Sequence, residues 1–198
     1  MKILKYFTVL ISLLFLLICG ILFTAFFAAQ NEKDTVPESI LSQDVLDHRP
    51  MLRQAAAEYG IEDYEDYLLA IIQVESEGLH TDVMQSSESL GLPPNSLTTE
   101  ESIRQGCQYF ARLLNLAEEK GCDLDSVLQA YNYGSGFLDY VAENGNAYSF
   151  SLAQSFAEEQ AAGEQVVYLN PVALKENGGW RYAYGNMFYV RLINQYLE

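Results

Sequence analysis

The sequence predicts an all-α domain that follows a single N-terminal transmembrane helix. Three observations support this fold class. From about residue 48 onward, apolar residues recur at intervals of three and four, which is the spacing of one helix face. The same region contains no convincing alternating run of the kind that a strand requires. Finally, residues 6–29 are apolar, uncharged and numerous enough to cross a bilayer.

The apolar stretch divides the chain into four predicted parts. They are a cytoplasmic tail at 1–5, a membrane anchor at 6–29, a flexible linker at 30–47 and a folded domain at 48–198. The linker is polar and acidic and shows no helical period. Lys2 and Lys5 favour a cytoplasmic N-terminus, so we expect a single-pass protein of the cell membrane with its domain outside the cytoplasm.

A cleaved signal peptide is the competing interpretation of the apolar stretch. Its apolar region would be shorter, about 7 to 15 residues, and would end in an Ala-x-Ala-like site. Here Phe stands at the −3 position for cleavage after either Ala28 or Ala29. A lipoprotein signal fits less well, because Cys19 is followed by more apolar chain. The sequence therefore favours an uncleaved anchor.

Charge and cysteine content exclude several classes of function. All 27 acidic residues follow the apolar stretch with nine of the 11 basic ones, a formal charge of −18 that disfavours nucleic acid as a partner. Cys107 and Cys122 are expected to be unpaired, because a helix predicted over 99–119 would hold them too far apart for a disulfide. His48 and His80 are the only histidines and neither neighbours a cysteine, so no metal site and no cofactor is predicted.

Helical spacing and capping residues place the elements of the domain. Helices are predicted at 48–59, 64–76, 99–119, 123–131, 149–162 and 188–197, with irregular chain at 86–97 and 163–180. Gly60 is expected to cap the end of the first helix, and Asp63 the start of the second. Thr98 and Glu101 have the spacing of a capping box at the start of the third.

Glu75 occupies an unusual position in the predicted helix 64–76. Leu68, Ile71 and Ile72 form its apolar stripe, and Glu75 is the next residue on that stripe. A buried carboxyl without a cationic partner keeps its proton to a higher pH than an exposed one. A general acid for glycosidic cleavage needs this property, because it must protonate the leaving oxygen near neutral pH. The alternative is a last-turn residue that points to water.

Three short segments between residues 75 and 134 form a recognisable series, namely Glu75-Ser76, Val83-Met84-Gln85 and Ala130-Tyr131-Asn132-Tyr133-Gly134. They resemble, in the same order, the Glu-Ser, Gly-Leu-Met-Gln and Ala-Tyr-Asn-x-Gly motifs of the lysozyme-like superfamily. Each motif is weak alone, but the three together over about sixty residues are far more specific. The resemblance implies a lysozyme-like fold.

Within that superfamily, the chain from about Arg49 onward most resembles the lysozyme-like domain of CwlT-type cell-wall hydrolases of Gram-positive bacteria and their conjugative elements. The segments that carry this resemblance are Asp-Val-Met-Gln-Ser-Ser-Glu-Ser at 82–89, Ser-Ile-Arg-Gln-Gly at 102–106 and Tyr-Gly-Asn at 184–186. It implies that Glu75 is the catalytic acid and Asp82 a second catalytic carboxylate.

Two features depart from these families. Asp82-Val83 stands where Gly-Leu is more usual, which separates the chain from the soluble lytic transglycosylases. Many CwlT-type proteins also carry a cysteine-peptidase domain, for which a chain ending at Glu198 leaves no room. Cleavage of peptide bonds is therefore not expected.

The remaining site residues follow from the same resemblance. The substrate-binding residues would be Ser76, Gln85, Ser87, Tyr131, Asn132 and Tyr184. Ser76 could orient the carboxyl of Glu75 and Gln85 could contact an N-acetyl group, although both are equally suited to stabilising local turns. Asp82 could be a simple turn residue, and Glu88 is a rival for the role of second carboxylate.

The leading prediction of function is a muramidase that cuts the β-1,4 bond between N-acetylmuramic acid and N-acetylglucosamine in peptidoglycan glycan strands. A lytic transglycosylase, which leaves 1,6-anhydro ends, is the nearest alternative. An alternative from another class is a non-catalytic, membrane-tethered wall-binding scaffold, with a wall-crossing secretion or conjugation complex as its partner.

Overall fold

The computed structural model describes residues 41–197. The predicted cytoplasmic tail, the predicted anchor at 6–29 and most of the predicted linker lie outside these residues, so those assignments stay predictions. Among the described residues, no helix combines the length and the apolar composition that a membrane span requires.

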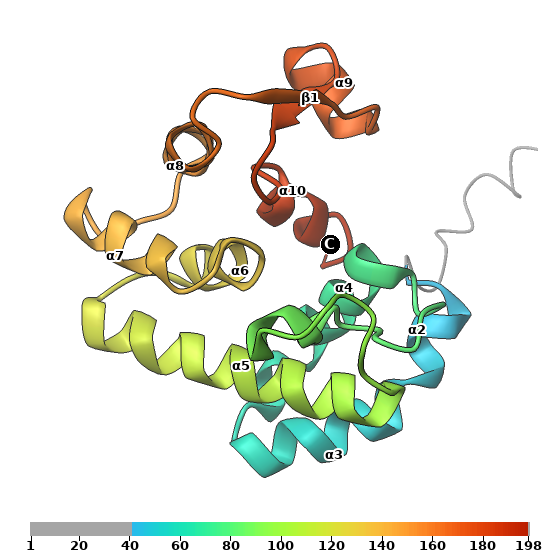
Figure 1. Ribbon diagram of the computed structural model, residues 1–198. Coiled ribbons are helices and arrows are strands. Elements are labelled where there is room, and N and C mark those ends of the chain that lie inside the picture. Colours follow the sequence, from blue (N-terminus) through green and yellow to red (C-terminus); the bar gives the residue numbers. More distant parts are fainter. Residues whose placement is uncertain (1–40, 198) are drawn as a thin grey trace, which may run out of the picture. The chain divides into compact units, whose positions relative to one another are not determined.

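Residues 41–197 are mostly helical (Figure 1). The elements are α2 (Gln43–Asp47), α3 (Arg49–Tyr59), η1 (Glu62–Tyr64), α4 (Glu65–Ser76), η2 (Ser86–Leu90), α5 (Thr99–Lys120), α6 (Leu124–Tyr133), α7 (Gly136–Glu143), α8 (Phe150–Gln160), β1 (Gln165–Val167), α9 (Pro171–Asn177), β2 (Trp180–Tyr182) and α10 (Tyr189–Asn194). The two strands pair antiparallel, with Val166 opposite Arg181.

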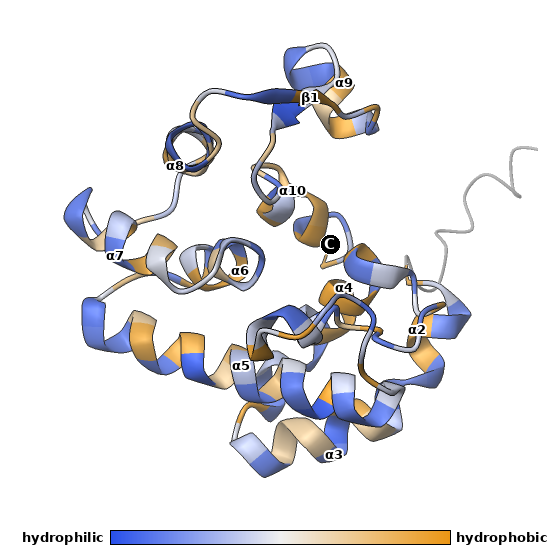
Figure 2. Cartoon of the chain, in the orientation of Figure 1, coloured by the Kyte–Doolittle hydropathy of each residue, from blue (hydrophilic) through white to orange (hydrophobic). Residues whose placement is uncertain are grey.

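Helix α4 lies at the centre of the core. Its residues from Leu68 to Ile72 are all fully buried, and the helix packs against α2, α3 and α10. The long helix α5 lies between α3 and α6 (Figure 1). Figure 2 shows hydrophobic and hydrophilic residues recurring along α5, as expected for an amphipathic helix that covers the core on one side only. Helices α2, α3 and α10 thus surround the helix whose last turn contains Glu75.

Capping signals predicted the long helices accurately. Gly60 adopts the left-handed conformation and ends α3, as expected. Thr98 and Glu101 form the predicted capping box at the start of α5. Asp123 and Ser149 accept hydrogen bonds as N-caps of α6 and α8, so both helices begin one residue after the predicted start.

Several boundaries differ from the predictions. Asp63 does not cap α4, because it lies in the 3-10 turn η1 and Tyr64 is the N-cap. Helix α7 was not predicted, and the segment expected to be irregular at 163–180 contains α9 and a small sheet. The predicted linker overlaps α2, whose Val45 is fully buried in the core. The folded unit therefore begins at Leu41 rather than at His48.

Helix α2 is fastened to the chain that follows Glu75. The backbone N–H of Ser42 donates to the side chain of Gln73 on α4, at 2.7 Å. The hydroxyl of Ser42 donates to the carbonyl of Glu77 at 3.1 Å. Gly78 adopts a φ of +79°, and a Cβ there would lie 2.7 Å from the backbone of Asp44. Only glycine allows so close an approach in that conformation.

Cys107 and Cys122 are unpaired, in agreement with the sequence. Cys107 is fully buried on α5, and burial raises the pKa of its thiol to about 12. This thiol stays protonated near neutral pH and behaves as a small core residue.

The motif segments meet around Met84. Met84 is fully buried, its backbone N–H donates to the Ser102 hydroxyl at 3.0 Å, and its carbonyl accepts from the Tyr131 hydroxyl at 3.0 Å. Its side chain packs directly on the backbone of α5 at Gly106, where a Cβ would lie 2.5 Å from Sδ. Glycine at 106 is therefore what lets the loop after α4 approach α5.

This contact predicts the effect of substitution at Gly106. Gly106→Ala should lower the free energy of unfolding by about 1–2 kcal/mol, because overpacking against Met84 outweighs the better helix propensity of alanine. Urea unfolding of the full chain in detergent, followed by circular dichroism, measures this. The control is Gly136→Ala on α7, where no atom lies within 4 Å of the added Cβ. Equal stability of the two variants would contradict the prediction.

Candidate active site

Glu75 lies in the last turn of α4, as predicted, and its side chain is half-buried. The hydroxyl of Tyr189 donates a hydrogen bond of 2.6 Å to its Oε1 atom. Tyr189 is itself buried on α10 and comes from the far end of the chain. No cation in residues 41–197 forms an ion pair with Glu75. The carboxyl is thus held by a neutral donor rather than by a charge.

Burial raises the pKa of Glu75 from its ordinary value of 4.5 to about 7. The hydrogen bond from Tyr189 opposes this shift, whereas the negative charges of Glu88 and Asp82 add to it. Near neutral pH a substantial fraction of Glu75 is therefore protonated and able to donate its proton. A raised pKa is what the position of Glu75 on the apolar stripe of α4 predicted.

Asp82 has the opposite environment. Its side chain is fully buried, and its Oδ1 accepts from the Ser102 hydroxyl at 2.6 Å and from the backbone N–H of Ser86 at 3.0 Å. Its Oδ2 accepts from the backbone N–H of Ser87 at 3.2 Å. Burial alone would raise the pKa of Asp82, but the hydrogen bonds from Ser102, Ser87 and Ser86 outweigh it and lower the pKa. Asp82 is thus a charged group that fastens η2 to α5.

This geometry bears on the predicted role of Asp82. A fully buried carboxylate with both oxygens engaged does not face a sugar in this conformation. Its role as second catalytic carboxylate stays a prediction. Glu88, the rival residue, is exposed on η2.

The three predicted substrate-binding residues nearest Glu75 in sequence differ in placement. Ser76 is buried, and its hydroxyl donates to the carbonyl of Val83 at 2.7 Å rather than to Glu75. Ser87 is a fully buried residue of η2. Gln85 is partly exposed, with its side-chain amide donating to the Asp82 carbonyl at 3.0 Å. Ser76 and Ser87 therefore stabilise the loop, and Gln85 alone of the three is open to a ligand.

A groove runs beside this loop. A cavity of about 390 Å³ lies between η2, α5, α6 and the chain before α10. Its lining includes Gln85, Glu88, Ser89, Tyr109, Tyr131, Asn132, Tyr133, Gly134, Tyr184 and Gly185. Glu75 is not part of this lining, but Glu88 and Tyr131 are, and both interact electrostatically with its carboxyl. Glu75 therefore lies near residues of this groove without lining it.

The predicted residues Tyr131, Asn132 and Tyr184 come together in this groove. The Tyr184 hydroxyl donates to the carbonyl of Tyr133 at 2.7 Å. Asn132 Oδ1 accepts from the backbone N–H of Asn186 at 2.6 Å. The Ala-Tyr-Asn and Tyr-Gly-Asn segments are thereby joined, and the amide nitrogen of Asn132 has no partner among the described residues.

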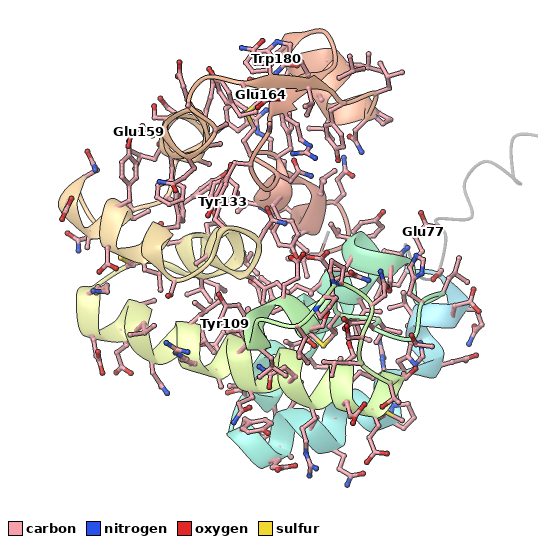
Figure 3. The ribbon with its side chains drawn as sticks, in the orientation of Figure 1. Glu77, Tyr109, Tyr133, Glu159, Glu164 and Trp180 are labelled. Carbon is pink, nitrogen blue, oxygen red and sulfur yellow. The ribbon has the colours of Figure 1, made fainter. Side chains whose placement is uncertain are left out.

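Tyr109 and Tyr189 were not singled out by the sequence. In Figure 3 the Tyr109 side chain rises from α5 toward α6, and its ring lies 5.6 Å from that of Tyr131. The same figure shows Tyr133 on the side of α6 that faces α8, where its hydroxyl donates to the carbonyl of Ala153. Tyr189 follows Glu75 by 114 residues, so no local pattern could pair them.

Comparison with known proteins identifies the family. A family model described as Lysozyme-like matches residues 42–197. The bifunctional muramidase/DL-endopeptidase CwlT of Bacillus subtilis (strain 168) is 36% identical over 159 residues, which cover 80% of this chain and 43% of CwlT. The uncharacterized membrane protein YocA of the same strain is 33% identical over 159 residues, or 80% of this chain and 70% of YocA.

A solved structure supports the same assignment. It is a Staphylococcus aureus subsp. aureus Mu50 protein described as similar to a lipoprotein of the NLP/P60 family. It matches with a TM-score of 0.79 and 59% sequence identity, over 80% of this chain and 54% of that chain. This chain thus spans about half of the solved chain and less than half of CwlT. The chain belongs to the lysozyme-like family, and its domain is the lysozyme-like domain of the CwlT-type hydrolases.

Proposed function

We propose that this domain hydrolyses the β-1,4 bond between N-acetylmuramic acid and N-acetylglucosamine in peptidoglycan, with Glu75 as general acid. Its family and its similarity to a muramidase support a peptidoglycan hydrolase. The observation that carries the finer proposal is the pKa of Glu75, which burial raises to about 7 beside an open groove. A carboxyl that is still protonated near neutral pH can protonate a glycosidic oxygen.

The groove supplies the other requirements of glycoside cleavage. Tyr109 and Tyr184 offer partly exposed rings on which the C–H faces of sugars can pack, and the buried ring of Tyr131 supports that of Tyr109. Proton transfer from Glu75 releases the leaving sugar and leaves positive charge on the ring that remains. Glu88 is an exposed carboxylate of the groove, so in our proposal it stabilises this charge or positions the attacking water. Asp82 then acts by holding the loop that carries Glu88.

In our proposal, residues 6–29 hold the domain at the outer face of the cell membrane. An enzyme tethered in this way reaches only the wall nearest the membrane. Local opening of the wall, for example beside a conjugation machine, is the role that the CwlT-type resemblance suggests.

Substitution of Glu75 tests the proposal directly. Glu75→Gln should reduce lysis of purified peptidoglycan by about 10²–10⁴-fold, because glutamine cannot donate the proton. Zymography and mass spectrometry of the digest measure this, and wild type should produce reducing muramic ends. Glu77→Gln, at the exposed neighbouring position, is the matched control and should retain activity. Anhydro ends would instead indicate a transglycosylase, and an inert wild type would indicate a scaffold.

The raised pKa of Glu75 also predicts how stability depends on pH. The folded state holds the proton up to about pH 7, whereas the unfolded state loses it near pH 4.5. Wild type should therefore lose about 3 kcal/mol relative to Glu75→Gln as the pH rises from 4.5 to 8. Urea unfolding of both proteins across this range gives the difference. A difference that does not change with pH would show that the carboxyl is ordinary.

Two further substitutions separate the roles of Asp82 and Glu88. Asp82→Asn should lower the free energy of unfolding by about 1–3 kcal/mol, because one buried N–H or hydroxyl donor loses its acceptor. Glu88→Gln should change stability by less than about 0.5 kcal/mol but reduce lysis. Unfolding and lysis are measured for both variants. If Asp82→Asn is fully stable but inactive, Asp82 itself takes part in catalysis.

A further inference from the structure

A second cavity lies beside the small sheet and shares part of its lining with the groove. This cavity of about 520 Å³ is lined by Asn132, Val166, Tyr168, Arg181, Gly185 and Asn186, among others. It shares Asn132 and Gly185 with the groove beside Glu75. The two cavities are therefore neighbours that meet at Asn132 and Gly185. A ligand that lies in the groove can extend a substituent into the second cavity.

Arg181 gives this cavity a fixed positive charge. It lies on β2 opposite Val166 of β1, and both residues line the cavity. Its Nη1 atom donates to the carbonyls of Tyr182 and Gly185, and the guanidinium carbon lies 5.6 Å from the centre of the Tyr168 ring. These contacts use one nitrogen and orient the planar group. The remaining donors, Nε and Nη2, have no hydrogen-bond partner within residues 41–197.

No carboxylate of the described residues pairs with Arg181. Five other cations of this region do have such partners, namely Arg49, Arg53, Arg104, Lys120 and Arg191. The chain carries 27 acidic residues and only 11 basic ones, so acidic partners are plentiful. A half-buried arginine that points into a cavity without one is suited to an external anion, since guanidinium matches a carboxylate through two parallel hydrogen bonds.

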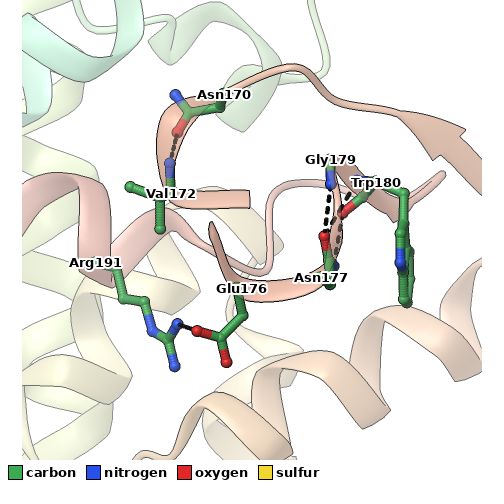
Figure 4. Close-up of polar contacts among 7 residues, drawn as sticks. All are labelled: Asn170, Val172, Glu176, Asn177, Gly179, Trp180 and Arg191. Atoms are coloured by element: carbon green, nitrogen blue, oxygen red, sulfur yellow. Dashed lines mark hydrogen bonds and ion pairs between the residues drawn. The ribbon is translucent and has the colours of Figure 1, made fainter. Parts of the chain in front are cut away.

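The surroundings of Arg181 hold it firmly. Figure 4 shows that the Asn177 side chain accepts from the backbone N–H groups of Gly179 and Trp180, which lead into β2. In the same view Glu176 of α9 pairs with Arg191 of α10. On the groove side, the Asn186 amide donates to the Tyr168 hydroxyl at 3.1 Å. These contacts order the chain on both sides of the cavity, while the bonds from Nη1 to the carbonyls of Tyr182 and Gly185 hold the guanidinium itself.

We infer that the Arg181 cavity binds a carboxylate on the 3-O-lactyl substituent of N-acetylmuramic acid, while the sugar ring lies in the groove. This inference rests on the proposed function. Of the two sugars of a glycan strand, only N-acetylmuramic acid carries such a substituent, and N-acetylglucosamine is uncharged. The carboxylate belongs either to a free lactyl group or to the peptide attached to it. Arg181 would then determine which sugar occupies the site and therefore which bond is cut.

Binding of defined glycans tests the inference. The full chain in detergent carries Glu75→Gln, so that no probe is cleaved. The probes are two peptidoglycan tetrasaccharides, one with free lactyl groups and one with lactyl-L-Ala-D-Glu, each compared with its methyl ester by titration calorimetry. At least one of the two probes should bind about tenfold more tightly as the free acid than as the methyl ester, and this preference should disappear in Arg181→Gln. Which acid is preferred identifies the source of the carboxylate.

A matched control and the opposing outcomes complete the design. Lys175→Gln removes the same charge from the exposed face of α9, outside the cavity, and should keep the preference for acid. Equal affinity for acids and esters would overturn the inference, as would a preference that survives in Arg181→Gln. Glu75-dependent lysis of peptidoglycan by the wild type would leave the proposed function standing in that case. Failure of every probe to bind would overturn the inference, and failure of every probe together with an inert wild type would overturn both.

Discussion

A carboxyl group kept largely out of water, next to a tyrosine hydroxyl and without a cation, is the constraint on which the rest of this site depends. On an exposed helix end, Glu75 would be an ordinary acid. Here its pKa rises to about 7, because α4 lies at the centre of the core and burial disfavours the charged form. This placement lowers the stability of the fold as the pH rises from about 4.5 to about 7. The hydrogen bond from Tyr189 limits the rise in the pKa of Glu75, because it stabilises the carboxylate that remains after the proton has left.

Two acids seven residues apart show how local donors decide a pKa. Burial raises the pKa of both Glu75 and Asp82. Asp82, however, receives hydrogen bonds from Ser102 and from the backbone of η2, whereas Glu75 receives one, from Tyr189, within the described part of the chain. Donors favour the charged form, so the pKa of Asp82 falls while that of Glu75 rises. One acid can thus serve as a permanent structural charge while the other remains a proton donor.

The sequence predicted the parts of the fold that have local causes. Helices α3, α5, α6 and α8 follow from apolar spacing and from side-chain or glycine caps, and Glu75 followed from the stripe of α4. Short elements were missed because a three-residue strand such as β1 has too few residues to show a period. The partnership of Tyr189 with Glu75 and the position of Arg181 depend on packing between distant segments, which spacing alone does not reveal.

The attachment of α2 has a practical consequence for any shortened version of this protein. Ser42 and Gly78 tie the first residues of the domain to the loop directly after Glu75. A fragment trimmed to begin at His48 would leave Gln73 without the backbone donor at Ser42 and would uncover the core beside Val45. Its loss of activity would then reflect damage at the amino-terminal edge rather than anything about the chemistry. A soluble fragment for crystallography or kinetics should therefore start upstream of Leu41.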